Sequence, residues 1–212
     1  MSKLKNAAHA DEKATHKAAQ ARDTLPVRVL GGLSEGADQP PLIALSLATI
    51  ALGALLRKPA VARGGARMLA SHALATGIKT VLKSGIDRTR PVKALAEGHH
   101  IGKGTGSDDT NLNSFPSGHT AGAVAVAQAA ARDLPGIALP VRLTALAVGA
   151  IQMPRGKHYI SDVLVGAAIG WASEGAVSAA VRLATDLWAR RERGSVSEPV
   201  LQAADEAPAA PR

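Results

Sequence analysis

The stretch FPSGHT, residues Phe115–Thr120, ends a polar, glycine-rich loop and opens a long alanine-rich segment. Its proline and serine suit the cap and first turn of a helix, so we predict a helix over residues 117–132. Free N–H groups at such a helix start can bind an anion, and Ser117 and Gly118 let a ligand approach the backbone closely. His119 places a titratable group beside that site. The stretch therefore indicates an anion site with a proton donor, which suggests phosphate chemistry.

The composition limits the classes of protein to which the chain can belong. It has 212 residues, a formal net charge of +8 and no cysteine, with one Phe, one Tyr and two Trp. The lack of cysteine excludes disulfides, cysteine nucleophiles and thiolate metal sites. The positive charge suits nucleic acid, anionic lipid or a phosphorylated substrate, but nucleic-acid readers usually add stacking aromatic residues. We therefore expect membrane lipid and a phosphorylated substrate as partners, and no nucleic acid.

Hydropathy predicts an all-α fold, a bundle of about five core helices between polar ends. Residues 1–40 are expected to be a polar, partly mobile arm without a secretory signal, residues 41–190 a helical domain, and residues 191–212 a disordered tail. The first core helix is the uncharged segment 42–56, which is short beside the roughly 20 residues of a membrane span. We interpret the bundle as membrane-spanning; the alternative is a soluble bundle that buries this helix.

The sequence predicts the other core helices at residues 60–82, 117–132, 139–153 and 159–190. Gly64 and Gly65 are expected to interrupt the first of these four. Residues 84–116 are predicted to form a long polar loop, and a loop of this length in a compact domain is usually functional. We find no internal repeat and no alternation of the period that strands show.

A basic cluster, KSGIDRTRP, stands where the second core helix ends. Lys83 is delivered by the helix, and Arg90 follows in the loop, stiffened by Pro91. Lysine is a compact charge and arginine a planar fork, and together they suit the several oxygens of a phosphate. Taken alone, a solvated basic turn at a helix C-terminus is the commoner origin of such a cluster.

Another cluster, RGKHYISD at residues 155–162, precedes the last helix. His158 and Asp162 are four residues apart at a helix start, so both can lie on one face. A carboxylate bound to one imidazole nitrogen fixes the tautomer and leaves the other nitrogen free to attack. The alternative is a capping role for Ser161 or Asp162, and His119 could likewise be incidental to a helix cap.

In their order and spacing the three clusters, Lys-x6-Arg-Pro, Pro-Ser-Gly-His and Gly-x-His-x3-Asp, resemble the type 2 phosphatidic acid phosphatase superfamily. This superfamily also includes bacterial acid phosphatases and vanadium haloperoxidases. The similarity covers roughly residues 42–188, and the second motif matches without a substitution. It implies a helical bundle with the active site at the helix ends on one side, and a metal-independent phosphatase that needs no cofactor.

The resemblance also implies a role for each motif residue. His158 would be the nucleophile that forms a phosphohistidine, Asp162 would orient it, and His119 would protonate the leaving oxygen. Phosphate oxygens would be bound by the remaining motif residues, Lys83, Arg90, Ser117 and Gly118. No metal ligands are expected, and the adjacent His99 and His100 are interpreted as solvated loop residues.

One position departs from the family pattern. The superfamily usually carries an arginine six residues before the nucleophilic histidine, and Gln152 stands there instead. Arg155 lies three residues later, which is nearly one helical turn along the same face. We therefore hypothesise that Arg155 supplies the missing guanidinium to the phosphate site, with Gln152 as a neutral hydrogen-bond donor.

The resemblance favours a vanadate-sensitive lipid phosphatase of a bacterial-type inner membrane. Candidate substrates are undecaprenyl diphosphate, phosphatidic acid, phosphatidylglycerol phosphate and lipid A phosphates. The alternatives are a soluble acid phosphatase of the same superfamily, a vanadate-dependent haloperoxidase, and a non-catalytic basic membrane protein that binds anionic lipid. Basic residues follow the first, third and fifth core helices, so the positive-inside rule predicts that these ends are cytoplasmic and that the active site faces outward.

Overall fold

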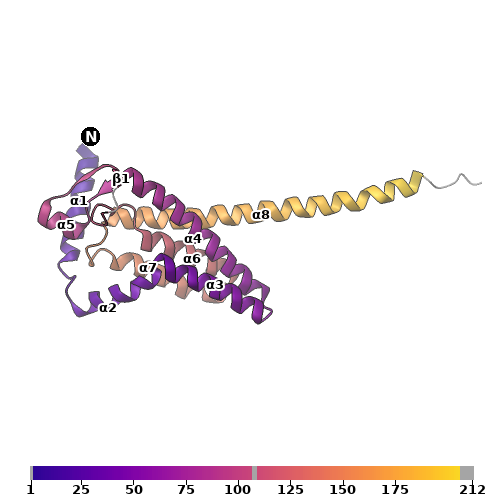
Figure 1. Ribbon diagram of the computed structural model, residues 1–212, viewed down its shortest axis with the longest axis horizontal. Coiled ribbons are helices and arrows are strands. Elements are labelled where there is room, and N and C mark those ends of the chain that lie inside the picture. The colour runs from indigo at the N-terminus through magenta and orange to yellow at the C-terminus, as the bar shows by residue number, and fades with distance from the viewer. Residues whose placement is uncertain (1, 107–108, 206–212) are drawn as a thin grey trace, which may run out of the picture. The chain divides into compact units, whose positions relative to one another are not determined.

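The computed structural model describes residues 2–106 and 109–205, and the described chain is mostly helical (Figure 1). Its α-helices are α1 (Ser2–Ala19), α2 (Leu25–Ser34), α3 (Gln39–Leu55), α4 (Pro59–Gly85), α5 (Pro91–Glu97), α6 (Gly118–Asp133), α7 (Ala138–Ile151) and α8 (Ile160–Asp205). Two short 3-10 helices are η1 (Glu35–Ala37) and η2 (Pro135–Ile137). The predicted helical fold class is confirmed.

Two compact units divide the chain. The first runs to Gly175 and contains all elements from α1 to the start of α8, and the second begins at Ala176 and contains the rest of α8. The last core helix was predicted to end near residue 190, and the structure continues α8 to Asp205. Residues 206–212 of the predicted tail lie outside the described residues, and the predicted domain boundaries stay predictions.

A small antiparallel sheet lies within the segment that was predicted to be a loop. Strand β1 (Ile86–Arg88) pairs with β2 (Ile101–Lys103), and α5 lies between the two strands in the sequence. Thr105 donates two hydrogen bonds to Asp87 Oδ2, at 3.0 and 2.8 Å, which fasten the chain after β2 to β1. Strands of three residues are too short to show a period of two, which is why the sequence did not reveal them.

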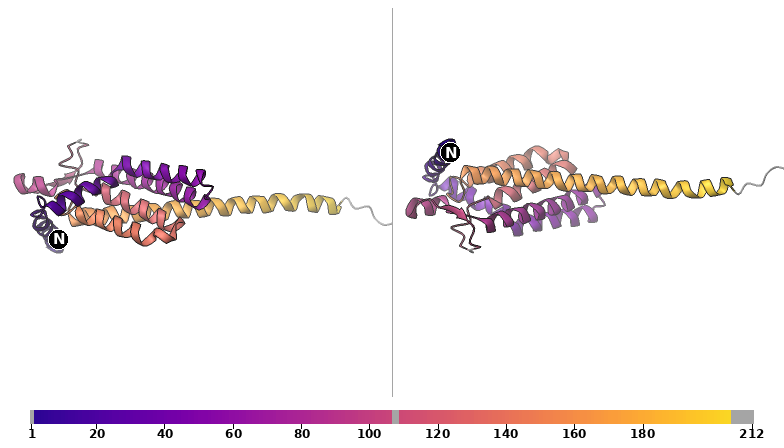
Figure 2. Two further views of the ribbon diagram at one scale, coloured as in Figure 1. Left: turned by 90° about the horizontal axis from the view of Figure 1, so that it is seen from below. Right: turned by 90° about the horizontal axis from the view of Figure 1, so that it is seen from above.

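Helix α6 is the centre of the first unit, and its core-facing surface is built from small side chains. Ten of its 16 residues are buried, and most of these are alanine. Alanine is the best helix former, and its small side chain lets α4 and α7 pack closely against α6. Helices α3 and α4 form a neighbouring antiparallel pair, seen side by side in Figure 2.

The predicted break in α4 is wrong, because the helix runs unbroken through Gly64 and Gly65. Both glycines are buried. A Cβ atom on Gly65 would lie 2.6 Å from Ile50 N and 2.9 Å from Ser46 O, which belong to the backbone of α3. The glycine therefore serves the close approach of two helices rather than the ending of one.

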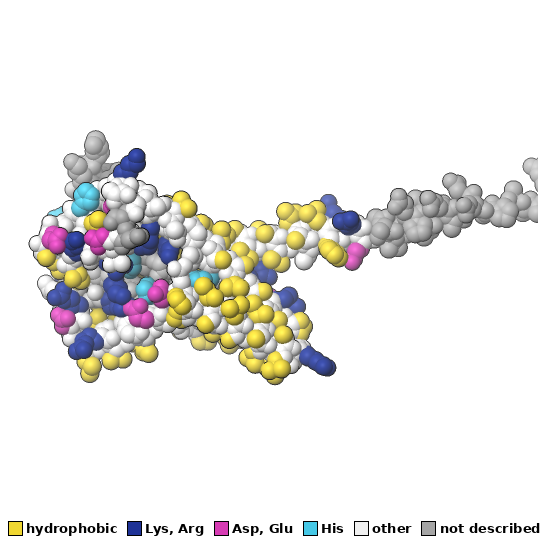
Figure 3. All heavy atoms as spheres, in the orientation of Figure 1, with side chains coloured by type: hydrophobic (Ala, Val, Ile, Leu, Met, Phe, Trp, Pro, Cys, Tyr) yellow, Lys and Arg dark blue, Asp and Glu magenta, His cyan; other side chains and the backbone are white. Residues whose placement is uncertain are grey.

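Large apolar side chains lie on the outside of the bundle. Leu139, Leu143 and Leu146 form one exposed row on α7, and Figure 3 shows hydrophobic side chains gathered over α3 and α4. Among the described residues, one helical segment, Ile160–Arg193, has the length and apolar composition of a membrane span. The pair Leu25–Ala37 and Gln39–Leu55, bent by 56°, would be a second if it forms a single span. Exposed apolar rows of this kind mark surfaces that meet lipid or a partner.

We expect Gly65→Ala to lower the free energy of unfolding by about 1–3 kcal/mol, because the added methyl group meets backbone atoms that cannot move away. Gly77→Ala is the matched control on the same helix, since no heavy atom beyond the backbone of its own helix turns lies within 4 Å of the added Cβ. This control should leave stability unchanged or raise it by up to about 1 kcal/mol. Thermal unfolding of the purified proteins in detergent makes the comparison, and equal midpoints for the two variants would contradict it.

Candidate active site

His158 is a buried imidazole at the turn before α8. Its Nδ1 atom lies 2.7 Å from Ser114 O and 3.9 Å from Asp162 Oδ2. A carbonyl oxygen can only accept, so Nδ1 carries the proton and donates it to Ser114. The distance to Asp162 is too long for a hydrogen bond, and this carboxylate acts on the ring through its charge. The lone pair is therefore on Nε2, the nitrogen on the other side of the ring.

Asp162 is a fully buried carboxylate whose oxygens are occupied by three donors. Arg88 Nη1 donates to Oδ1 at 2.6 Å, while Ser114 Oγ and Tyr159 N donate to Oδ2 at 2.6 and 2.9 Å. Ser114 thus contacts both members of the predicted pair, His158 through its carbonyl and Asp162 through its hydroxyl. Neither Arg88 nor Ser114 was among the predicted site residues. Their only signal in the sequence is proximity to the motifs, Arg88 two residues before Arg90 and Ser114 directly before FPSGHT.

Ser117 caps α6, as the sequence predicted. Its side chain accepts from Thr120 N at 3.4 Å, and its own N–H donates to Asp162 O at 3.1 Å. The second contact ties the start of α6 to the start of α8. A Cβ atom on Gly118 would lie 3.1 Å from the side chain of Lys79, so this lysine of α4 lies beside the open helix start. Lys79 is a further cation that the motif analysis did not include.

Lys83 and Arg90 bring positive charge to the buried imidazole. Lys83 lies near the end of α4, and its Nζ atom donates a hydrogen bond to Asn113 O. Both Lys83 and Arg90 act electrostatically on His158. Burial, together with the positive charges of Lys83 and Arg90, lowers the pKa of His158 to about 4, against the opposing effect of Asp162. The imidazole is therefore neutral at neutral pH. Arg90 Nε is a buried donor without a hydrogen-bond partner among the described residues, and burial and the charge of Arg155 lower its pKa.

Arg155 and His119 both contact the carboxylate of Glu35, the first residue of η1. Arg155 Nη2 and Lys157 Nζ contact Glu35 Oε1, the latter at 2.9 Å, and His119 Nε2 lies 3.3 Å from Oε2. Arg155 Nη1 also donates to Ser34 Oγ at 2.7 Å. The guanidinium thus faces the same charged cluster as His119, and Glu35 supplies the compensating negative charge.

Gln152 is fully buried and serves the structure around it. Its Nε2 donates to Val148 O at 2.9 Å and to Ser34 Oγ at 3.3 Å. Its Oε1 lies 3.5 Å from Arg155 Nη1. Gln152 is therefore a neutral neighbour that helps to hold Arg155, while Arg155 carries the charge.

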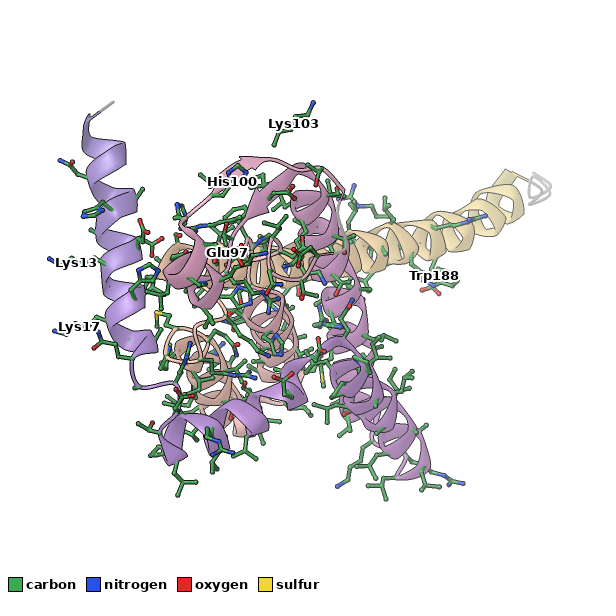
Figure 4. The ribbon with its side chains drawn as sticks, turned by 60° about the vertical axis from the view of Figure 1, so that its left-hand side comes forward. Lys13, Lys17, Glu97, His100, Lys103 and Trp188 are labelled. Carbon is green, nitrogen blue, oxygen red and sulfur yellow. The ribbon has the colours of Figure 1, made fainter. Side chains whose placement is uncertain are left out.

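The two loop histidines differ in their surroundings. His100 is exposed, as Figure 4 shows and as the sequence analysis expected. His99 is partly buried: its Nε2 lies 3.5 Å from Arg88 Nε, and its ring packs edge-on against Tyr159 with a centroid distance of 5.3 Å. The interpretation of His99 as a solvated residue is therefore wrong, because the short sheet turns it inward.

One group of side chains has a spacing that a metal ion could use. Glu35, Asp38 and His119 each offer a ligand atom within 4.8 Å of the others. Both oxygens of Glu35 already contact cationic or imidazole groups, so the carboxylate has its charge compensated without an ion. No other set of three such ligands appears in the part of the chain that the structure describes.

The structure brings the predicted histidines, carboxylate and cations together at the ends of α4, α6 and α8, an arrangement whose chemistry suits phosphoryl transfer. The family model of the PAP2 superfamily matches residues 64–186, and the chain belongs to this superfamily. The resemblance of the motifs to this superfamily is therefore confirmed. The predicted enzyme class, a phosphoric-ester hydrolase, is confirmed as well. No curated protein matches the chain.

Two solved structures share the fold over most of their length. One is a transmembrane PAP2-type phosphatidylglycerolphosphate phosphatase from Bacillus subtilis, with a TM-score of 0.64 and 24% identity, covering 84% of this chain and 87% of that chain. The other is LpxE from Aquifex aeolicus, with a TM-score of 0.58 and 22% identity, covering 78% of this chain and 92% of that chain. At these identities the similarity is one of fold.

We expect Ser114→Ala to lower the free energy of unfolding by about 1–3 kcal/mol, because the buried Asp162 carboxylate loses a hydrogen-bond donor that water cannot replace. Ser84→Ala is the control, since the Ser84 hydroxyl is an exposed donor to Val81 O in its own helix. Thermal or denaturant unfolding measures both variants. A Ser114 variant as stable as the control would show that the hydroxyl is dispensable for holding Asp162.

Proposed function

We propose that the protein is a membrane lipid phosphatase that cleaves a phosphate or diphosphate head group through a phosphohistidine at His158. The observation that carries the proposal is the state of this imidazole. It is buried and neutral, its Nδ1–H is fixed on Ser114 O, and Lys83 and Arg90 act on it electrostatically. A nucleophile needs a free lone pair, and a transferring phosphoryl group needs fixed positive charge around it.

In the first step, Nε2 of His158 attacks phosphorus and the bond to the leaving oxygen breaks. His119 donates a proton to that oxygen, and the Asp162 carboxylate stabilises the positive charge that develops on the imidazole. Lys83, Arg90, Arg155 and the free N–H groups at the start of α6 bind the phosphoryl oxygens, with Ser117 and Gly118 at the helix mouth. In the second step, His119 takes a proton from water, which attacks phosphorus and releases phosphate from His158.

An apolar cavity supports a lipid as the substrate. It has a volume of about 430 Å³ and lies among α3, α6 and α7, with Ala37, Leu42, Ala123, Val126, Ala127 and Val148 in its lining. Gly36 and Ala37, which directly follow Glu35, also line it, so the cavity begins next to the charged cluster. A hydrocarbon chain fits such a lining while its head group lies among the cations. The described transmembrane phosphatidylglycerolphosphate phosphatase, which shares this fold, is consistent with a lipid phosphate substrate.

We also propose an inner-membrane location with the site facing outward. The exposed leucine rows suit contact with lipid. Helix α4 reaches the site at its C-terminal end, where Lys83 lies. Arg57 and Lys58 connect α3 to α4 at the opposite end of this helix. Basic residues at this far end favour its placement in the cytoplasm. Undecaprenyl diphosphate, phosphatidic acid, phosphatidylglycerol phosphate and lipid A phosphates remain the candidate substrates.

Phosphate release from a panel of these lipid phosphates in detergent tests the proposal. We expect turnover by the wild type, inhibition by vanadate and no effect of EDTA, and a loss of about three orders of magnitude or more in His158→Ala. His100→Ala is the control, since its side chain is exposed. Turnover that survives in His158→Ala would exclude the phosphohistidine. Recovery of the native protein without detergent would favour the soluble acid phosphatase instead.

The role of Arg155 is tested separately. We expect Arg155→Ala to lower kcat/KM about 10-fold to 100-fold, because a charged hydrogen bond to the phosphoryl group contributes about 1.5–3 kcal/mol. Gln152→Leu should have a smaller effect on kcat/KM and act through stability, since Gln152 is buried and bonded to Val148 O. Steady-state kinetics with one lipid phosphate compares them. Intact kcat/KM in Arg155→Ala with a collapse in the Gln152 variant would reverse the assignment.

A further inference from the structure

Helix α1 precedes the segment that matches the family, residues 64–186, yet its side chains contact the first turn of α8. Asp11 Oδ1 accepts from Ser161 N at 3.2 Å, and Thr15 Oγ1 accepts from Ile160 N at 3.4 Å. Asp11 Oδ2 accepts a second, short hydrogen bond from the Ser161 hydroxyl. The start of α8, which carries Asp162, is therefore capped by a distant helix.

The sequence of α1 accounts for this contact. Asp11 and Thr15 are four residues apart, so they lie on one face of the helix. Lys13 and Lys17 have the same spacing and lie on the opposite face, where Figure 4 shows them pointing away from the rest of the molecule. Thr15 is fully buried and the Asp11 side chain is 13% exposed. One face of α1 is thus packed against the site region, while the other is solvated.

The N-terminus of a helix has free N–H groups and a partial positive charge. A carboxylate placed there is stabilised and takes up donors that would otherwise have no partner. This role usually belongs to a residue next to the helix in the sequence. In α8 the Asp162 side chain accepts from Tyr159 N, and the N–H groups of Ile160 and Ser161 are left for α1.

Arg88 links Asp11 to the predicted catalytic carboxylate. Its Nη2 lies 3.1 Å from Asp11 Oδ2, and its Nη1 lies 2.6 Å from Asp162 Oδ1. The guanidinium is 3.9 Å above the ring of Tyr159, and its side chain is 7% exposed. An arginine held by two carboxylates and an aromatic ring has little freedom to rotate. The Asp162 oxygen that it binds is consequently fixed relative to His158.

We propose that Asp11, together with Thr15 on the same face of α1, is a positioning residue for the phosphoryl-transfer site. It holds Arg88 and the first turn of α8 so that the Asp162 carboxylate keeps its place beside the His158 ring. Asp11 touches neither the imidazole nor the open helix start of α6, so it acts through Arg88 and Ser161. The inference rests on the proposed function and assigns α1 a structural role in the catalytic site.

Asp11→Asn tests the inference, because the amide keeps the size of the side chain and removes its charge and one acceptor. We expect kcat for lipid phosphate to fall about 10-fold to 100-fold, since displacement of a supporting group typically costs this much. KM should stay within about 2-fold, because the cations that bind the phosphate are not contacted by Asp11. Asp11→Glu, which keeps the charge, should recover part of the lost kcat.

Asp23→Asn is the matched control, since the same substitution there removes an exposed carboxylate that pairs with the neighbouring Arg22. It should leave kcat and the melting temperature unchanged. Wild-type kcat in Asp11→Asn would overturn the inference, as would a fall in kcat that is matched by a rise in KM and a broad loss of stability. Absence of turnover in the wild type would instead overturn the proposed function, so the two failures are distinguishable.

Discussion

The structure of the site depends on the burial of one carboxylate, that of Asp162. A buried charge is strongly unfavourable unless it is paired and hydrogen-bonded. Arg88 from β1, Ser114 from the loop before α6 and the Tyr159 amide supply the three hydrogen bonds that compensate it. The most distant of these donors, Arg88, lies 74 residues from Asp162 in the chain. Satisfying this one group therefore fixes the sheet, the loop before α6 and the start of α8 relative to one another.

The arrangement of the other charges follows from that constraint. With Asp162 occupied by its donors, His158 is bonded to a carbonyl and stays neutral, and neither Lys83 nor Arg90 forms a salt bridge with a carboxylate among the described residues. Arg90 keeps a buried N–H without a partner in the described chain. Across the site, the Glu35 carboxylate contacts His119 and offsets the repulsion between Arg155 and Lys157. Cations gathered at a helix N-terminus in this way have the properties of an anion site.

The three motifs were predictable because each sits at a helix end, where caps, breakers and charge are local features of the sequence. The helix start at Ser117 and the closeness of His158 to Asp162 on one turn needed no distant information, but the carbonyl of Ser114, which accepts the hydrogen bond of the imidazole, was not foreseen. Arg88 and Ser114 could not be assigned, since their roles come from contacts across 74 and 48 residues, and the strand that carries Arg88 has no detectable period. Gly65 was misinterpreted for the same reason. A glycine in a helix looks like a break until the neighbouring backbone is known.

The position of Gln152 shows how the segment before residue 40 becomes part of the site. An arginine at this fully buried position would need a counter-charge close by, or its desolvation would cost several kcal/mol. Glutamine avoids that cost, because Val148 O and Ser34 Oγ satisfy its amide. The positive charge stands one turn later, on Arg155, where Ser34 and Glu35 hold the guanidinium. The neutral residue at 152 and the charged residue at 155 therefore both depend on Ser34, which binds them, and the charged residue also depends on Glu35. Because Ser34 and Glu35 lie outside the family-matched segment, the motifs alone could not reveal this dependence.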